Sequence, residues 1–194
     1  MSLSERKKRH TENLCESILQ AALKIARKEG WNAVSTRKVA EEIEYSTTAI
    51  YHYFGNKDAI LLELQKEGFS LLIKDFEKKI KHYKTSSERL VQISMGYFEF
   101  YKKNPELYQL MFNLGISSKE KPFELIKQLK KLVLLTLFDL SSVESEELFL
   151  NWWAIVHGFA AISLTSLFVC DDKQTDNMLE SSVLRFMYSL PAKK

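Results

Sequence analysis

The sequence is poor in the residues that build tight turns and disulfide frameworks: its 194 residues include only six glycines, three prolines and two cysteines. Alternating apolar patterns typical of strands are nearly absent, so the composition favours a compact, all-α protein. The cysteines, Cys15 and Cys170, lie far apart within predicted helices, which favours reduced thiols over a disulfide.

Sequence features of membrane proteins and of common enzyme classes are also missing. No run of about 18 or more apolar residues is free of charge and no apolar segment opens the chain, so we expect a cytoplasmic protein with no membrane contact. Glycine-rich phosphate loops and nucleophile elbows do not occur, so we expect no enzymatic activity and no cofactor. The four histidines, at positions 10, 52, 82 and 157, lack Cys or carboxylate partners at ligand spacing, so we expect no metal.

The most informative segment is Gly30 to Leu64, which predicts two short helices joined by a tight turn and followed by a third helix. Thr36 and Ser46 are suited to cap the first two helices. Their apolar positions at helical spacing are Val39, Ala40 and Ile43 in the first helix and Ala49, Ile50, Tyr53 and Phe54 in the second. We expect these residues to point inward.

The opposite face of the second helix carries Thr47, Thr48, Tyr51 and His52, again at helical spacing. A solvated face would normally carry Lys, Glu or Gln. Short hydroxyl side chains let the backbone approach a duplex closely, bond phosphate oxygens or base edges, and offer a methyl group to thymine. This face is therefore suited to the major groove of DNA.

From about residue 12 to residue 64 the chain resembles the N-terminal domain of the TetR family of bacterial transcriptional repressors. The resemblance rests on Ala21-Ala22-Leu23, Gly30-Trp31, Val34-Ser35-Thr36, Val39-Ala40, Ser46, Ile50-Tyr51, Tyr53-Phe54 and Asn56-Lys57-Asp58. It implies that Thr36, Thr47 and Tyr51 contact DNA and that Lys57 binds phosphate. The complete set of predicted DNA-binding residues is Thr36, Arg37, Tyr45, Thr47, Thr48, Tyr51, His52 and Lys57.

Two residues depart from the family pattern. Glu44 stands where the family usually has Gly in the turn, so it either accepts a left-handed conformation or alters the turn. Ala49 replaces the usual Thr, which affects one contact. Neither departure disturbs the apolar pattern of the two helices.

A basic run, Arg6 to Arg9, lies ahead of the first predicted helix, while the net charge of +3 alone is too small to identify a nucleic-acid binder. Two interpretations of the run stay open. It is either a solvated, disordered terminus or an arm that adds phosphate contacts or reaches a minor groove beside the recognition helix.

Beyond Leu64 the pattern predicts further helices, and the helix that begins at Lys57 is expected to continue between two domains. The predicted helices cover residues 57–83, 87–103, 105–114, 123–140, 144–170 and 176–190, with a loop at 115–122. Nine helices without a strand are the architecture that the TetR resemblance implies. We expect an N-terminal arm and helix-turn-helix domain at residues 1–56 and a ligand-binding and dimerisation domain at residues 57–194.

Within the predicted helix 144–170, Trp153 precedes His157-Gly158 by four residues, which resembles the WHG type of C-terminal domain in some TetR-like regulators. A cavity lined by this helix and the nearby aromatics would accept a hydrophobic or flat small-molecule effector. The predicted ligand-binding residues are Tyr97, Tyr101, Met111, Phe112, Trp153 and His157. The alternative stays open that these aromatics are packed core and that His157 is a hydrogen-bonded core residue.

The last two predicted helices carry more apolar surface than one small domain needs. The predicted dimerisation residues are Trp152, Phe159, Leu167, Val183, Phe186 and Met187. In the family the corresponding helices pair as a four-helix bundle about a two-fold axis. The resemblance thus implies a homodimer whose recognition helices lie about 34 Å apart on a palindromic operator.

Taken together, the sequence predicts a repressor that binds double-stranded operator DNA. Its effector would release the DNA by favouring a conformation in which the helix from Lys57 pivots. An alternative from a different class is a helical interaction module that keeps the fold and has lost DNA reading, which Glu44 in the turn allows.

Overall fold

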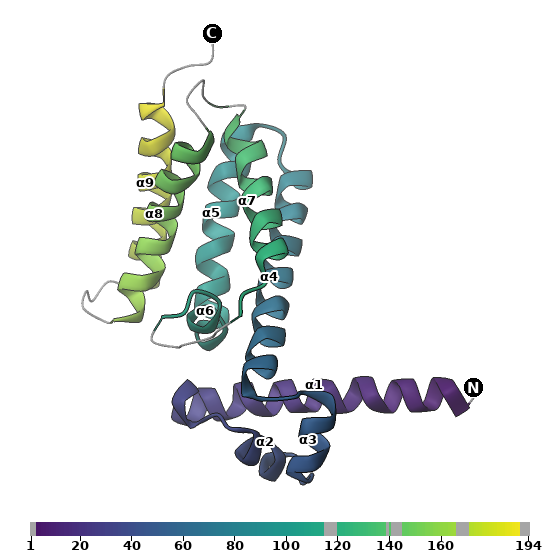
Figure 1. The fold of residues 1–194 in the computed structure, drawn as a ribbon. Coiled ribbons are helices and arrows are strands. Elements are labelled where there is room, and N and C mark those ends of the chain that lie inside the picture. The colour runs from purple at the N-terminus through teal and green to yellow at the C-terminus, as the bar shows by residue number, and fades with distance from the viewer. Residues whose placement is uncertain (1–2, 115–119, 139, 141–144, 166–170, 191–194) are drawn as a thin grey trace. The chain divides into compact units, whose positions relative to one another are not determined.

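The computed structural model describes residues 3–114, 120–138, 140, 145–165 and 171–190 (Figure 1). Over these residues the chain forms nine α-helices, one 3-10 helix and no strand, so the predicted all-α class is confirmed. The elements are α1 Leu3–Glu29, η1 Trp31–Ala33, α2 Thr36–Glu42, α3 Thr47–Tyr53, α4 Lys57–His82, α5 Ser86–Lys103, α6 Pro105–Met111, α7 Phe123–Phe138, α8 Ser145–Leu164 and α9 Asp172–Ser189.

The chain divides into two compact units. The first comprises residues 1–68 and 106–122, and the second comprises residues 69–105 and 123–194. As predicted, α4 is one uninterrupted helix, and each unit contains part of it. The functional boundary predicted between residues 56 and 57 falls at the start of α4, inside the first unit, and stays a prediction.

In the first unit, α1 packs on η1 and α2, and α2 packs on α3. Leu14, Ile18, Ala21 and Ile25 of α1 are buried at intervals of four, three and four residues, which places them on one face of the helix. Figure 1 shows α2 and α3 on one side of α1, so the buried face of α1 supports the two short helices.

The short helix α6 is also part of the first unit, although α5 precedes it in the chain. The indole Nε1 of Trp31 donates a hydrogen bond to the Glu106 carbonyl oxygen at 3.0 Å. The buried side chain of Gln65 in α4 donates from Nε2 to the Leu110 carbonyl oxygen at 2.9 Å. Since these acceptors lie at the two ends of α6, the bonds fix the helix to η1 and to α4.

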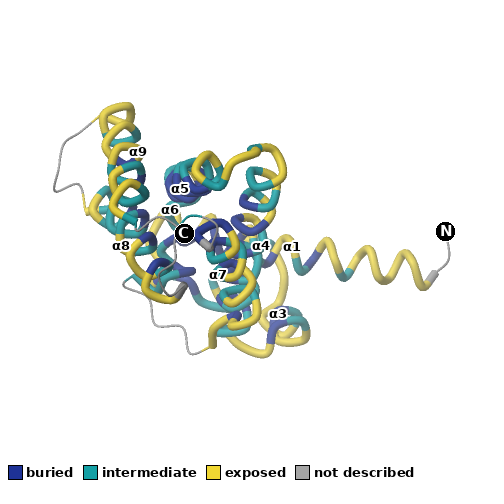
Figure 2. Tube along the Cα trace, turned by 90° about the horizontal axis from the view of Figure 1, so that it is seen from above, coloured by how far each residue is buried: buried dark blue, intermediate teal, exposed yellow. Residues whose placement is uncertain are grey.

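The second unit is built around α5, which packs against α7, α8 and α9. Figure 2 shows buried residues on α5, which include Leu90, Ile93, Tyr97 and Phe98. Trp152 of α8 is fully buried and donates from Nε1 to the Ser94 hydroxyl at 2.8 Å, while Ser94 donates to the Leu90 carbonyl oxygen at 2.6 Å. This chain satisfies the polar atoms that a large buried aromatic brings into the core.

Most helix ends lie within two residues of the prediction, and the end of α6, the end of α8 and the start of α9 differ by more. α9 begins at Asp172 rather than 176, because the Asp171 side chain caps it by accepting from the Gln174 backbone N–H at 2.7 Å. α6 ends at Met111 rather than 114, because Asn113 adopts a left-handed conformation with φ 52. The described part of the helix predicted at 144–170 covers Ser145–Leu164, and residues 166–170 lie outside the described ranges.

The helix α8 is apolar over most of its length. Its segment Glu146–Leu164 is long and apolar enough to cross a membrane by length and composition, with a mean hydropathy of 1.2. The same helix packs against α5, α7 and α9 and buries Trp152, Val156 and Ala160 at intervals of four residues. Packing within the second unit explains part of this composition, since 22% of the apolar segment is buried there.

Candidate nucleic-acid interface

Each of the two short helices in the first unit begins at a serine cap. Ser35 has an extended backbone, and its hydroxyl accepts from the Lys38 N–H at 3.2 Å. The prediction that Thr36 is this cap is wrong by one residue, because Thr36 already has helical geometry. Ser46 caps α3 as predicted, since its hydroxyl accepts from the Ala49 N–H at 3.1 Å.

The turn between α2 and α3 keeps its geometry without a glycine. Glu44 has φ 58, so of the two alternatives it accepts the left-handed conformation. The Tyr45 N–H donates to the Ala40 carbonyl oxygen at 2.9 Å, and the Glu44 N–H donates to the Glu41 carbonyl oxygen at 3.3 Å. These two bonds form a Schellman motif, which ends α2 and directs the chain into α3.

The two faces of α3 are divided as the sequence predicts. Ile50 and Phe54 are buried, whereas Ala49 and Tyr53 are half-buried. The residues of the opposite face, Thr47, Thr48, Tyr51 and His52, are all exposed. The helix therefore displays three hydroxyls and an imidazole to solvent while its apolar side holds it to the first unit.

The remaining predicted DNA-binding residues lie around this face. The Tyr45 side chain is 44% exposed at the end of the turn. Arg37 is exposed on α2, where its Nε donates to the Glu41 carboxylate at 2.8 Å. Lys57, at the first position of α4, donates from Nζ to the Trp31 carbonyl oxygen at 3.2 Å, so in this structure its ammonium is held by η1. Their DNA contacts stay predictions.

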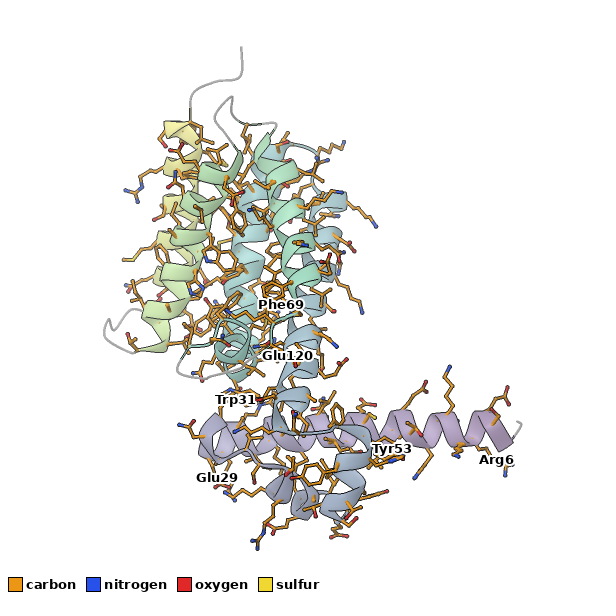
Figure 3. The ribbon with its side chains drawn as sticks, in the orientation of Figure 1. Arg6, Glu29, Trp31, Tyr53, Phe69 and Glu120 are labelled. Carbon is orange, nitrogen blue, oxygen red and sulfur yellow. The ribbon has the colours of Figure 1, made fainter. Side chains whose placement is uncertain are left out.

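The basic run Arg6 to Arg9 is helical, because α1 already begins at Leu3. The sequence-based placement of this run ahead of the first helix is therefore wrong. A signal was present in the sequence, since no glycine or proline occurs between residues 3 and 29. Figure 3 shows Arg6 near the free end of α1.

Three of the predicted ligand-binding residues meet inside the second unit. The Tyr97 hydroxyl lies 3.0 Å from His157 Nδ1, and the Trp153 ring stacks on the His157 ring with centroids 5.4 Å apart and an interplanar angle of 12°. Burial lowers the pKa of His157 below its ordinary value. At neutral pH the cluster therefore presents a neutral imidazole that stacks on the Trp153 ring and is hydrogen-bonded to the Tyr97 hydroxyl.

The other predicted ligand-binding residues lie elsewhere. Tyr101 is a buried residue of α5, one turn after Tyr97. Met111 and Phe112 belong to the first unit, where the Phe112 ring packs against Tyr108 with centroids 4.8 Å apart. Whether any of the six binds an effector stays a prediction. Among the described residues no group of three or more His, Cys, Asp or Glu side chains could hold a metal ion.

The predicted dimerisation residues fall into three groups. Trp152 and Val183 are fully buried within the second unit, so the prediction that their side chains face a partner is wrong. Phe159, Phe186 and Met187 are half-buried, and Leu167 lies outside the described residues. A helical repeat identifies an apolar stripe but does not tell which stripe the chain itself covers.

The helices α8 and α9 do carry an exposed apolar surface, but its large side chains differ from the predicted dimerisation residues. Its large side chains are Leu150, Ile162, Met178 and Tyr188, all at least 48% exposed. Between the two helices lies an open groove of about 680 Å³, lined by Glu147, Leu148, Asn151, Ala154, Ile155, Ser182, Arg185, Phe186, Ser189 and Leu190. Of the predicted set, Phe186 alone lines this groove in the described structure.

Comparisons with known proteins agree with this geometry. The family model of bacterial regulatory proteins of the tetR family matches residues 18–64. An uncharacterized HTH-type transcriptional regulator of Haemophilus influenzae is 30% identical over 95 residues, which cover 49% of this chain and 51% of that protein. The chain therefore matches about half the length of this relative.

Two solved structures show the fold. PfmR, a TetR family transcriptional regulator of Thermus thermophilus, aligns with a TM-score of 0.66 at 17% identity over 90% of this chain and 98% of that chain. The transcriptional regulator FadR of Bacillus subtilis, in complex with stearoyl-CoA, aligns with a TM-score of 0.74 at 19% identity over 90% of this chain and 97% of that chain. Residues 18–64 thus match the DNA-binding domain of the tetR family of bacterial regulatory proteins, and the described chain has the all-α fold of solved regulators of that family.

Proposed function

We propose that this protein is a cytoplasmic transcriptional repressor that binds a palindromic operator as a homodimer and is released by a small, largely hydrophobic effector. One observation carries the proposal. Thr47, Thr48, Tyr51 and His52 are exposed together on α3, while the opposite side of the same helix is buried. A helix of this kind enters the major groove with its polar side chains against base edges and phosphates.

The alternative of an interaction module without DNA reading loses its main support. It depended on Glu44 distorting the turn between α2 and α3. Glu44 instead adopts the left-handed conformation that glycine would provide, and both hydrogen bonds of the turn are formed. The orientation of α3 is therefore compatible with DNA reading.

The homodimer is proposed from the outer surface of α8 and α9. Four large apolar side chains are exposed there, and the groove between the two helices has Leu148, Ile155 and Phe186 in its wall. Exposed apolar patches on a soluble protein mark interaction sites. Pairing of this surface with its copy about a two-fold axis would place two recognition helices about 34 Å apart, one turn of DNA.

The effector is proposed to bind beside Tyr97, Trp153 and His157. These residues provide aromatic surface together with one hydrogen-bonding pair, which is the composition of a site for a mostly apolar molecule. The structural likeness to FadR in complex with stearoyl-CoA supports an acyl chain as one such molecule. No charged cluster among these three residues selects an ionic ligand.

Release follows from a shift between two conformations. Since α4 runs through both units, a pivot of this helix would move the recognition helices out of register with successive grooves. The effector acts only through its different affinity for the two conformations. Operator DNA must then weaken effector binding by the same factor by which effector weakens DNA binding.

Footprinting of the DNA that flanks the gene for this chain tests the proposal. We expect protection of two half-sites related by two-fold symmetry, with centres about 10 base pairs apart or a multiple of that distance. Protection of an asymmetric site would refute the homodimeric arrangement. Absence of protection on any flanking DNA, with a protein shown to be folded, would refute operator binding and favour the interaction module.

A further inference from the structure

The N-terminal turns of α1 extend beyond α2 and α3, as Figures 1 and 2 show. Leu14 is the first buried residue of this helix, and residues 4–10 are all exposed. The exposed turns hold the whole basic run from Arg6 to Arg9. These charges are therefore carried by a regular helix attached to the unit that contains α3.

The charges are sorted around this helix. At about 100° per residue, Lys7 lies on the stripe that continues into the buried residues Leu14 and Ile18. It therefore points to the side of α1 on which the rest of the first unit packs. Arg6 lies on the neighbouring stripe, four residues before His10.

The acidic residues that follow the basic run lie on the far side of the helix. Glu12 and Glu16 are separated from Lys7 by about 140° and 180° around the axis. Lys8 shares their side, and its Nζ lies 3.9 Å from the Glu12 carboxylate. Arg6 and Lys7 thus form one basic face of the exposed turns, whereas Lys8 and Arg9 lie on the side of the carboxylates, Arg9 about 20° from Glu16.

The basic face continues into a groove in the first unit. This α1 groove has a volume of about 360 Å³ and is lined by His10, Asn13, Leu14 and Ser17 of α1 and by Ile43 and Tyr45 of the turn. Tyr45 precedes the Ser46 cap of α3 directly. The groove therefore extends from the residue before the Ser46 cap to His10, which lies about one helical turn after Arg6.

We propose that Arg6, Lys7 and the α1 groove bind the sugar-phosphate backbone of the duplex whose major groove α3 reads. This inference rests on the proposed DNA binding and assigns it a second contact surface. A guanidinium and an ammonium neutralise phosphates, and the polar side chains of the groove are hydrogen-bonding groups of the kind that contact phosphate and sugar. From Arg6 to Ser17 the face extends about 16 Å, enough for several phosphates of one strand.

The proposal separates neighbouring residues of one basic run. Arg6 and Lys7 contact phosphates, whereas Lys8 does not, because it lies on the side of Glu12. Alanine at any of these three positions removes one positive charge and keeps a residue that favours the helix. Lys8→Ala is thus a matched control for Arg6→Ala and Lys7→Ala.

The experiment measures the affinity of each full-length variant for the footprinted operator, and for an unrelated duplex of the same length, between about 50 and 200 mM NaCl. For Arg6→Ala and for Lys7→Ala we expect weaker binding of both duplexes. The slope of the logarithm of the binding constant against the logarithm of the salt concentration should become shallower by about 0.9 for each phosphate that is no longer neutralised. In a dimer this change is doubled, because both copies lose the charge. Lys8→Ala should keep the wild-type slope. Circular dichroism shows whether α1 remains helical.

Equal slope changes in all three variants, or none in Arg6→Ala and Lys7→Ala, would overturn the proposal while wild-type operator binding persists. Failure of the wild-type protein to bind any duplex would instead overturn the proposed function. Variants that keep wild-type DNA binding but lose binding to vesicles of anionic lipid would assign the basic face to a membrane surface and equally overturn the proposal.

Discussion

The hydroxyl of Thr36 in α2 and the hydroxyl of Tyr51 in α3 lie 3.2 Å apart and form a hydrogen bond. The Tyr51 side chain is 53% exposed, so this bond orients a phenol that solvent or DNA can reach. Both residues belong to the set that the family resemblance assigns to DNA contact. The bond therefore links two residues that are predicted to contact DNA, and it would lower the entropy lost when they bind.

Removal of either hydroxyl should weaken operator binding, and the two losses should not add. For Tyr51→Phe, Thr36→Val and the double variant, titrations by fluorescence anisotropy should give a coupling free energy of about 0.5–1.5 kcal/mol. Tyr83→Phe, at a half-buried tyrosine between α4 and α5 in the second unit, is the control and should bind like the wild type. Strict additivity would mean that the two hydroxyls act independently on DNA.

Glycine at position 44 should stabilise the protein. A residue with a Cβ at φ 58 is strained by about 1–2 kcal/mol, and glycine removes most of this strain. In urea unfolding, Glu44→Gly should raise the free energy of unfolding by about 1 kcal/mol. The control Glu42→Gly, in the last turn of α2, should lower it by a similar amount, about 1 kcal/mol. A lower stability for Glu44→Gly would contradict the role assigned to this turn.

Alanine at position 68 should destabilise the contact between α4 and α6 in the first unit. A Cβ there would lie 2.5 Å from Met111 Sδ and 3.0 Å from Leu107 Cγ, and both neighbours are buried. Overpacking of this kind costs about 1–3 kcal/mol in thermal or urea unfolding. A Cβ added at Gly158 would meet no neighbouring atom within 4 Å. Gly158→Ala should therefore raise the free energy of unfolding by about 0.5–1 kcal/mol, because alanine favours the helix. Equal effects of the two substitutions would argue against the tight α4–α6 packing.

His157 should make stability depend on pH below neutrality. Burial lowers its pKa in the folded protein, while the unfolded chain keeps the ordinary value of 6.5. Below pH 6.5 the unfolded state binds a proton that the folded state does not, so the free energy of unfolding falls as the pH decreases toward the lower pKa. His157→Gln should lack this part of the decrease. Parallel pH profiles for variant and wild type, from urea unfolding, would show that the folded state does not resist protonation here.

The faces of the short helices could be predicted from sequence because their burial follows the helical period over two turns. Ile50 and Phe54 are buried and Tyr51 and His52 are exposed, as that period requires. The conformation of Glu44 could be reduced to two alternatives, because a Cβ restricts the left-handed region without forbidding it. The backbone conformation of Glu44 and the two hydrogen bonds of the turn decide between them.

Features that depend on tertiary packing could not be predicted in the same way. Trp152 lies on an apolar stripe, but the Ser94 hydroxyl that accepts from its indole is 58 residues away in the chain. The burial of Trp152 therefore depends on how α8 packs on α5. The early start of α9 depends on a single side-chain cap at Asp171. A helix boundary predicted from the spacing of apolar residues does not take such a cap into account.

Affinity for the footprinted operator, measured for wild type and for the variant Thr47→Ala with Tyr51→Ala, tests the central claim most directly. Both side chains are exposed, so the variant should unfold at the wild-type urea concentration. If the exposed face of α3 reads the duplex, operator affinity should fall by tenfold or more, since each base contact contributes about 1–3 kcal/mol. Wild-type affinity in a folded double variant would show that DNA is not read by this face.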